Sequence, residues 1–349
     1  MPFISVIVPC RNEAGYISQC LDSIIANSYP KDRTEILVID GMSEDNTGDI
    51  VREYENKYPY ICLFDNPKKV LAAAWNIGIK KAKGDIIMTL NAHGVFRNDY
   101  ISNCEKHFRQ YDADYIGGII ISRPRNNNYA DKAITIALSN GFGVGNSYFR
   151  IGLKKPMLAD TAAFGGYRKE IFGKIGLYKE DLDRSQDMEF HSRLRKMGGK
   201  ILLAPDMICD YYLRSGLKDF IKDSFVNGFW VLYPFKFTNI AVSLRHLTPM
   251  VFIVSIICLA FLSKLSIIFW WFLLFISALY ISAGLYNSFR IAVKEKDPGL
   301  LFIMPVLFAI LHVGYGLGTC YGGFKALIAK EFRYNHRIKT DGSRKEVES

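Results

Sequence analysis

The chain has 349 residues, of which half are hydrophobic, and its formal net charge is +10 at pH 7. A basic balance of this size suits an anionic membrane surface or a nucleic acid as a partner. Its seven cysteines stand singly, without CxxC or a Cys/His cluster, which argues against a zinc site and for reduced thiols in a cytosol-facing protein. The N-terminal MPFISVIVPC has no basic region and no cleavage site, so we expect no signal peptide.

The hydrophobic residues are concentrated in the C-terminal part of the chain. Residues 247–285 carry one charge, Lys264, and a second apolar block begins at Gly299. Basic residues flank these blocks and form no helical stripe interleaved with aromatics, which favours lipid headgroups over nucleic acid. We therefore expect a globular domain over residues 1–215, followed by a membrane-attached part.

The first 92 residues alternate between short apolar runs and amphipathic stretches. The run 3–9 is β-branched and ends in proline, as a buried parallel strand does. Ile17, Leu21 and Ile24 then recur at helical spacing. The two patterns repeat, so we expect strands at 3–9, 34–41, 61–67 and 85–92 and helices at 10–29, 42–58 and 70–84. This order predicts an α/β fold with a mostly parallel, doubly wound sheet.

Each expected strand ends in polar residues. These are Pro9–Glu13, Asp40–Gly41, Asp65–Asn66 and Asn91–His93. Ligands of open α/β sheets bind at the carboxyl ends of the strands, so we expect all four groups to form one site; polar loops without a ligand are the alternative. No GxGxxG follows the first strand and no GxxxxGK(S/T) occurs, so neither a Rossmann dinucleotide site nor a P-loop is supported.

Five segments in order carry a resemblance to a known family. They are SVIVPCRNEAGYISQCLDSI, ILVIDGMSEDNT, WNIGIKKAKGDIIMTLNAH, FGGYRKEIFGKIG and SQDMEFHSRLRKMGGKI. With these segments the chain resembles family 2 glycosyltransferases of the GT-A fold, and among them the membrane-attached exopolysaccharide enzymes of the succinoglycan type. The resemblance covers about residues 3–235. It implies a hexosyltransferase that uses a nucleotide sugar.

The resemblance places the nucleoside at the first two strand ends. Asp40 would accept a hydrogen bond from the N3–H of a uracil-type base, and Glu13 would help to hold the nucleoside. The alternative for Asp40 is a turn aspartate that caps the next helix. The other residues that we assign to the nucleotide site are Pro9, Arg11, Asn66 and Asn76.

The segment Asn91-Ala92-His93 stands where the family has D-x-D, and the resemblance implies that it contacts the donor phosphates and sugar. The family's last aspartate there binds Mn²⁺ or Mg²⁺, which stabilises the departing diphosphate. His93 can bind Mn²⁺ through a neutral imidazole nitrogen, whereas the Asn91 amide brings no charge. Three interpretations stay open: a working variant, an enzyme with weak metal dependence, or a substitution that lowers activity. His93 as a polar residue without a ligand is the alternative.

The general base implied by the resemblance is Asp187. QDMEFHSRLRKMG predicts a helix that begins at Ser185 or Gln186 and has Phe190, Leu194 and Met197 on its inner face. Asp187 then lies in the first turn, where the helix dipole stabilises its ionised form. A carboxylate opposite the leaving group is the arrangement that inverts the sugar carbon. An ordinary first-turn helix acid is the alternative.

The remaining site assignments concern the neighbours of this base. Glu189 and Arg193 are expected to pair one helical turn apart, and His191 to face solvent. Gly165 and Gly166 are expected to permit close approach to the donor sugar. We assign Asp160, Gln186 and Arg193 to the acceptor side.

The C-terminal part divides into three regions. Residues 216–245 predict an amphipathic helix at the membrane interface, with a core-facing helix as the alternative. Residues 246–330 predict transmembrane helices: a hairpin at 247–285, and a third segment at 300–328 that GYGLGTCYGG interrupts. Residues 331–349 form a basic polar tail.

The distribution of basic residues predicts the orientation in the membrane. Arg290, Lys294 and Lys296 lie in an expected loop, 286–299, which places that loop and the catalytic domain on the cytoplasmic side of a multi-pass protein. A third crossing would put the basic tail outside, so a re-entrant or interfacial third segment stays open. A buried helical core is disfavoured, because 39 residues carry only one charge.

These observations predict an inverting glycosyltransferase that moves one sugar. They do not favour a nucleic-acid-binding protein, which the net charge alone would allow. The expected donor is UDP-linked, and the expected acceptor is a polyprenyl-linked oligosaccharide in surface-glycan synthesis. A polyprenyl-phosphate sugar synthase and a non-catalytic nucleotide-sugar-binding scaffold are the alternatives, the latter because of Asn91. A processive synthase is disfavoured, because no QxxRW follows the Asp187 helix. The sugar, the linkage and the oligomeric state stay open.

Overall fold

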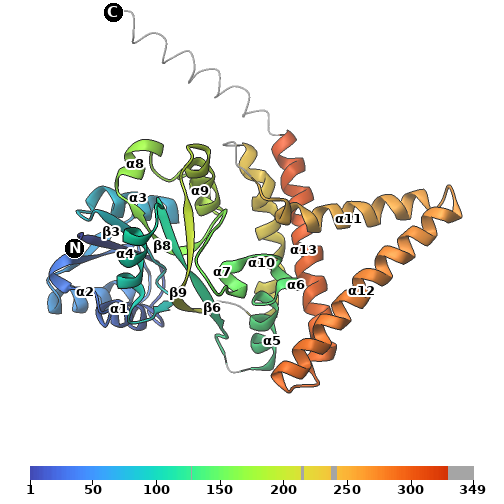
Figure 1. Cartoon of the computed structure of the whole chain (residues 1–349), viewed down its shortest axis with the longest axis horizontal. Helices are drawn as coiled ribbons and strands as arrows, with labels where there is room; N and C mark the ends of the chain where they lie inside the picture. Colours follow the sequence, from blue (N-terminus) through green and yellow to red (C-terminus); the bar gives the residue numbers. More distant parts are fainter. Residues whose placement is uncertain (127, 214–215, 237–241, 329–349) are drawn as a thin grey trace, which may run out of the picture. The chain divides into compact units, whose positions relative to one another are not determined.

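The computed structural model describes residues 1–126, 128–213, 216–236 and 242–328. The chain divides into two compact units, Met1–Ser215 and Gly216–Ser349, which Figure 1 shows with their elements labelled. The first unit is an α/β domain and the second is helical. The polar tail 331–349 lies outside the described residues.

The first unit is built on one mixed sheet of nine strands. The four expected strands are present and parallel, in the order β3-β2-β1-β4. Beyond β4 the sheet is mixed, because β8 lies antiparallel between β4 and β6, and β6 then pairs in parallel with β9. The strands are β1 (Ile4–Cys10), β2 (Thr34–Asp40), β3 (Ile61–Asp65), β4 (Ile86–Thr89), β5 (Gly94–Phe96), β6 (Tyr115–Arg123), β7 (Met157–Leu158), β8 (Ala163–Arg168) and β9 (Ile201–Tyr212).

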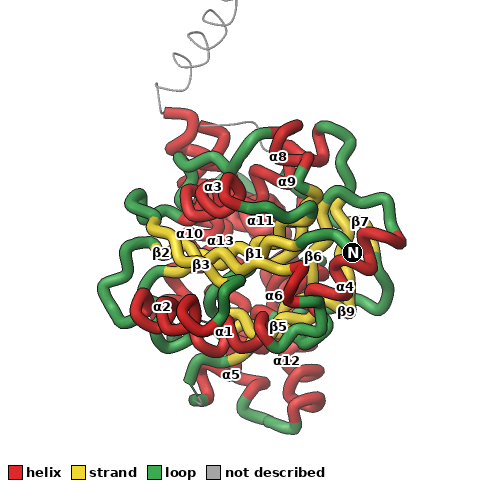
Figure 2. Tube along the Cα trace, turned by 90° about the vertical axis from the view of Figure 1, so that its left-hand side faces the viewer, coloured by secondary structure: helices red, strands yellow, loops and turns green. Residues whose placement is uncertain are grey.

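The helices of this unit cover both faces of the sheet. They are α1 (Ile17–Ile25), α2 (Thr47–Lys57), α3 (Leu71–Lys81), α4 (Tyr100–Gln110), α5 (Tyr129–Leu138), α6 (Gly141–Val144), α7 (Tyr148–Ile151), α8 (Glu170–Ile175) and α9 (Gln186–Lys196). Side chains alternate across a strand, so Val6 and Val8 pack with α1, α2 and α4, whereas Ile7 packs with α3, α8 and α9. Figure 2 shows α1 and α2 on one side of the strands and α3 on the other. The expected doubly wound α/β core is therefore present.

The second unit consists of four helices and a short 3₁₀ turn, η2 (Tyr233–Lys236), in its described part. The helices are α10 (Leu217–Leu232), α11 (Leu244–Leu262), α12 (Ile267–Glu295) and α13 (Leu300–Ile328). The last three are long and apolar enough to cross a membrane. They expose large apolar side chains, such as Trp271 and Phe302, which are 65% and 76% exposed; a face of this kind requires lipid or a partner. α11 and α12 form the expected hairpin.

Two expectations for this unit were wrong. The loop expected at 286–299 is mostly helix, because α12 continues to Glu295 and carries Arg290 and Lys294 in its last turns. The glycines of GYGLGTCYGG do not interrupt α13. They lie where the helix touches α10: a Cβ on Gly318 would come within 2.0 Å of the Phe225 carbonyl oxygen, and one on Gly322 within 2.2 Å of that of Phe229. Small residues at four-residue spacing let two helix backbones approach closely.

We expect Gly318→Ala to destabilise the second unit by about 1–3 kcal/mol, because the added methyl group overlaps a backbone oxygen that cannot move alone. The matched control is Gly323→Ala, whose nearest neighbour is the flexible Leu232 side chain at 3.1 Å. Thermal denaturation of the full chain in detergent measures the difference. Equal midpoints for the two variants would contradict the close contact between α10 and α13.

Candidate active site

The carboxyl ends of the first four strands lie along one edge of the sheet. Cys10 is in register with Asp40, and Asp40 is in register with Asp65. On the other side of β1, Ile7 pairs with Thr89, two residues before Asn91. The predicted alignment of the four polar strand ends is therefore confirmed.

The loops that follow β1 and β2 are held together by hydrogen bonds. The Asn12 N–H donates to Ser43 Oγ at 2.9 Å, and Asn12 Oδ1 accepts from the Glu44 N–H at 2.8 Å. The Glu13 N–H donates to Thr47 Oγ1 at 2.8 Å. Asn12 has a φ of 54°, a left-handed conformation that asparagine tolerates better than most residues. These bonds fix the backbone on which the candidate nucleotide residues stand.

The Asp40 carboxylate takes part in the turn after β2. It accepts hydrogen bonds from the N–H and the hydroxyl of Ser43, and it is 7% exposed. The turn role that the sequence left as an alternative is therefore present. A carboxylate has about four acceptor sites, so the turn leaves room for a base N–H, and base recognition stays a prediction.

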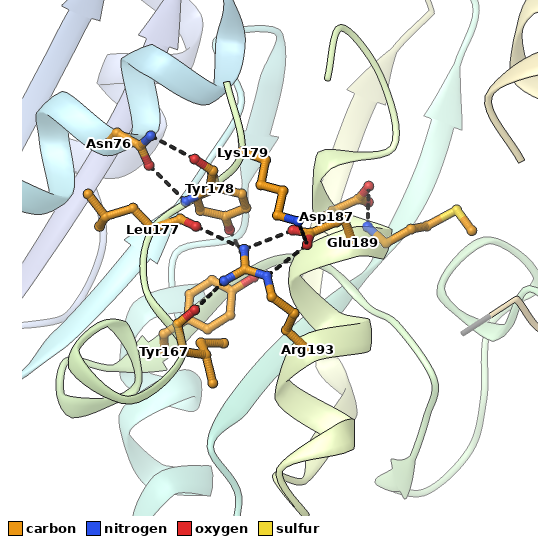
Figure 3. A network of polar contacts seen from close by, with 10 residues as sticks. Asn76, Tyr167, Leu177, Tyr178, Lys179, Asp187, Glu189 and Arg193 are labelled. Atoms are coloured by element: carbon orange, nitrogen blue, oxygen red, sulfur yellow. Dashed lines mark hydrogen bonds and ion pairs between the residues drawn. The ribbon is translucent and has the colours of Figure 1, made fainter. Parts of the chain in front are cut away.

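The other candidate nucleotide residues differ in how many contacts their side chains already make within the protein. Arg11 is 43% exposed at its side chain, packs against Gly41 and makes a 3.8 Å ion pair with Glu44. Pro9 lies in β1 opposite Ile39. Figure 3 shows Asn76 bound to the backbone of Tyr178, with hydrogen bonds of 2.9 Å in both directions.

Asn66 follows β3 and is buried. Its amide Nδ2 donates to the Val70 carbonyl at 2.9 Å. Its Oδ1 is buried and has no hydrogen-bond partner among the described residues. An orphaned buried acceptor is costly, and the assignment of Asn66 to the nucleotide site stays a prediction.

His93 is the centre of a buried polar network. Its Nδ1 lies 3.2 Å from Glu13 Oε1 and its Nε2 lies 3.0 Å from the Tyr211 hydroxyl. Burial lowers the pKa of His93 to about 4, so the imidazole is neutral at pH 7. With the Nδ1–H donated to the carboxylate, the Nε2 lone pair accepts from the Tyr211 hydroxyl.

The two residues before His93 shape the turn. Asn91 Oδ1 lies 3.5 Å from the His93 N–H, as in an Asx-turn. Ala92 is buried at 1% exposure, so its side chain packs in the core. No group of three or more His, Cys, Asp or Glu residues that could hold a metal occurs within the described ranges.

Asp187 lies in the first turn of α9, which begins at Gln186 as expected. Its Oδ1 accepts from the Met188 N–H at 2.8 Å, and the residue is exposed. The protein around the carboxyl partly desolvates it and raises its pKa, against opposing effects of the Met188 N–H and Arg150. Phe190 and Leu194 are buried as expected. Met197 was wrongly placed on the inner face: it follows the end of α9 and is 51% exposed.

Glu189 and Arg193 form the expected ion pair, and their side chains point into the protein. Arg193 Nε and Nη2 each lie 2.8 Å from a Glu189 oxygen, and Glu189 is 1% exposed. Arg193 also donates to the carbonyls of Ile175 and Leu177, as Figure 3 shows for Leu177. These contacts anchor the loop before α9 and give Arg193 a structural role. Its assignment to the acceptor side finds no support in them.

The expectation that His191 faces solvent was wrong. His191 is 1% exposed, and its ring nitrogens lie 2.8 Å from Thr161 Oγ1 and 2.8 Å from the Tyr167 hydroxyl. The Tyr178 hydroxyl continues the network to Tyr167 at 3.0 Å. Burial lowers the pKa of His191 to about 3. The buried face of α9 is wider than the positions of its apolar residues indicate. His191 therefore lies inside the protein, where Thr161 and Tyr167 contact its ring nitrogens.

The remaining acceptor and donor-sugar residues lie around this network. Asp160 is partly buried and interacts electrostatically with His191. Gln186 is buried and donates to the Leu182 carbonyl at 2.8 Å. Packing alone explains the two glycines: a Cβ on Gly165 would lie 2.0 Å from the Ile116 carbonyl oxygen, and one on Gly166 would lie 2.9 Å from Cys104 Sγ.

Two residues that the sequence reasoning missed connect His93 with Asp187. Tyr211 of β9 binds His93, and Arg150 of α7 interacts electrostatically with both Tyr211 and Asp187. No spacing pattern pointed to Arg150, because its position depends on the segment between β6 and β8. The pairing of Gly94 with Tyr211 places Tyr211 beside His93, and antiparallel pairing of this kind was absent from the expected parallel sheet.

Comparison with known proteins identifies the class to which this site belongs. A mannosyltransferase from Pyrobaculum calidifontis, PcManGT, solved in complex with GDP-Man and Mn²⁺, has the same fold, with a TM-score of 0.58 at 18% identity over 93% of this chain and 87% of that one. The fold is therefore of the GT-A glycosyltransferase type.

Sequence relatives then give the family. Residues 5–176 match the model for glycosyl transferase family 2. A dolichyl N-acetyl-alpha-D-glucosaminyl phosphate 3-beta-D-2,3-diacetamido-2,3-dideoxy-beta-D-glucuronosyltransferase from Methanococcus voltae is 30% identical over 336 residues, covering 94% of this chain and 98% of the relative. Succinoglycan biosynthesis protein ExoA from Rhizobium meliloti is 26% identical over 270 residues, 76% of this chain and 78% of the relative. The chain belongs to glycosyl transferase family 2 and is a glycosyltransferase.

We expect Arg193→Met to destabilise the protein by about 3–5 kcal/mol, because it removes the bidentate partner of a buried carboxylate. Glu189→Leu combined with Arg193→Met removes both charges and should recover part of this loss. The measurement is the thermal midpoint of the full chain in detergent. A double variant that is no more stable than Arg193→Met would show that the unpaired charge of Glu189 is not the cause of the destabilisation.

Proposed function

We propose that this glycosyltransferase moves one sugar, with inversion, from a UDP-linked donor to a polyprenyl-linked oligosaccharide in the assembly of a surface glycan. Two relatives support the acceptor class, since one is named for a dolichyl-linked substrate and the other for succinoglycan synthesis. Three helices long and apolar enough to cross a membrane would keep the enzyme where such a lipid is found. The observation that carries the proposal is the exposed carboxylate of Asp187, linked through Arg150 and Tyr211 to His93.

Asp187 would act as the general base. The acceptor hydroxyl attacks the anomeric carbon as the bond to the diphosphate breaks on the opposite face, and the hydroxyl proton passes to the carboxylate. Its raised pKa makes the carboxylate a stronger base than an ordinary aspartate. Its exposure leaves it open to an acceptor.

His93 could supply one protein ligand to a divalent cation, provided that the cation replaces the Tyr211 hydroxyl as the partner of Nε2. A metal-binding histidine commonly donates its second ring N–H to a carboxylate, and His93 faces Glu13 in this way. Its lowered pKa keeps it unprotonated. His93 would hold Mn²⁺ or Mg²⁺ together with phosphate oxygens and water, with Asn91 beside it. When bound, the cation would neutralise charge on the departing diphosphate, and PcManGT was solved with Mn²⁺.

The cytoplasmic orientation remains part of the proposal. Arg290 and Lys294 lie near the end of α12, and Lys296 follows it. Basic residues at the end of an apolar helix favour the cytoplasmic side. The catalytic unit would then meet a cytoplasmic nucleotide sugar and a lipid-linked acceptor on the same side.

We expect Asp187→Asn to lower the rate of transfer about 10²–10⁴-fold, because the amide cannot accept the hydroxyl proton, while donor binding is retained. Nucleotide release with UDP- and GDP-sugars and extracted lipid-linked oligosaccharides measures the effect. The wild-type rate should fall as the pH drops through the pKa of Asp187, beginning above the ordinary aspartate value of about 3.9. Unchanged transfer by Asp187→Asn would favour a polyprenyl-phosphate sugar synthase, whose phosphate acceptor needs no base.

A metal series tests the assignment of His93 and Asn91. We expect EDTA to abolish nucleotide release and Mn²⁺ to restore it, His93→Ala to raise the Mn²⁺ concentration for half-activity about 10–100-fold, and Asn91→Asp to lower it by adding a carboxylate. Arg52→Met, which removes an exposed arginine that pairs with Asp49, is the control and should have no effect on Mn²⁺ dependence. No nucleotide release in wild type with Mn²⁺ and none after Asn91→Asp would favour the scaffold alternative.

A further inference from the structure

Arg150 is partly buried, and its guanidinium has no acidic hydrogen-bond partner among the described residues. It lies in α7, and its backbone N–H donates to the Ser147 carbonyl at 2.8 Å. Its guanidinium lies 5.5 Å from the centre of the Phe149 ring. Its Nη1 is buried and has no hydrogen-bond partner within the part of the chain that the structure describes.

Such a group needs a physical explanation. A buried donor without an acceptor costs about 1–3 kcal/mol, and more when it is charged. Arginine cannot avoid the cost by losing its proton. Although burial lowers the pKa of Arg150, Asp187 and Tyr211 both act to raise it. An orphaned cation beside a reaction site therefore suggests that its anion is a ligand.

The surroundings of Arg150 indicate which anion fits. Asp187 and Tyr211, which binds His93, both interact electrostatically with Arg150. The charge of the guanidinium thus acts on the candidate base and on the residue that contacts His93. Its planar fork of N–H donors matches the oxygens of a phosphate.

We propose that Arg150 binds a phosphate oxygen of a substrate in the neighbourhood of Asp187 and Tyr211. The inference rests on the proposed sugar transfer, because that reaction brings phosphate to this site. Two sources share the chemistry: the diphosphate of the nucleotide donor and the phosphate of the lipid-linked acceptor. In either case Arg150 contacts substrate directly and compensates negative charge beside the base.

Binding and kinetic measurements on Arg150→Met and Arg150→Lys distinguish the sources. For the donor diphosphate, we expect Arg150→Met to weaken UDP binding by about tenfold or more and to leave uridine binding unchanged. Arg150→Lys should restore part of the UDP affinity. GDP and guanosine are titrated in parallel. For the acceptor phosphate, nucleotide binding stays unchanged and the KM for the extracted lipid-linked acceptor rises by about tenfold or more.

The control variant is Arg52→Met, which removes an exposed arginine that pairs with Asp49 on α2, and it should change none of these quantities. All titrations use the full chain in detergent, with thermal midpoints recorded for each variant. The proposal is overturned if Arg150→Met leaves UDP, GDP and acceptor affinities within about twofold of wild type, or weakens UDP and uridine equally. Titration with UDP requires no turnover, so a failure of the Asp187 assignment remains distinguishable from a failure of this one.

Discussion

The parallel register of β1 to β4 is the constraint on which the rest of the site depends. It brings Cys10, Asp40 and Asp65 to one level and sets the chain after β4 beside them. The loops after β1 and β2 are then close enough to exchange hydrogen bonds through Asn12 and Glu13. A slip of one residue in this register would turn every side chain of the slipped strand to the opposite face of the sheet. Burial of the apolar side chains therefore fixes the same strand register that brings the polar strand ends together.

The mixed half of the sheet completes the site that the parallel half begins. β5 follows His93 directly and pairs antiparallel with β9, which places Gly94 opposite Tyr211. His93 is consequently held between Glu13 from the first half and Tyr211 from the second. A neutral imidazole with a carboxylate on one nitrogen and a hydroxyl on the other has fully matched hydrogen bonds, which allows it to be buried.

Local sequence patterns predicted the elements whose stability depends on local periodicity. The four parallel strands, the helices between them and the start of α9 follow from apolar spacing and are where they were expected. The patterns failed where packing decides. His191 is buried because Thr161 and Tyr167 supply its hydrogen bonds, and α13 tolerates its glycines because α10 packs against them.

The site residues divide in the same way. Their strand-end positions followed from the α/β rule, whereas Tyr211 and Arg150 are brought to the site by strand pairing and by the segment between β6 and β8, neither of which leaves a periodic signal. Gly165 and Gly166 show the converse. Their presence in a motif pointed to a ligand, but the approach of β8 to its neighbours is sufficient to require them.

Two carboxylates two residues apart on α9 have opposite environments, and this difference supports the proposal that Asp187 is the base. Glu189 is buried and bidentately paired with Arg193, so its charge is neutralised within the protein. Asp187 is exposed, accepts a hydrogen bond from the Met188 N–H in its own turn, and has its pKa raised by partial desolvation. The pairing of Glu189 anchors the loop before α9 and holds the helix start in place, so that Asp187 can remain open and still be positioned. The start of α9 can thus leave the Asp187 carboxylate exposed because the ion pair of Glu189 with Arg193 holds the helix in position.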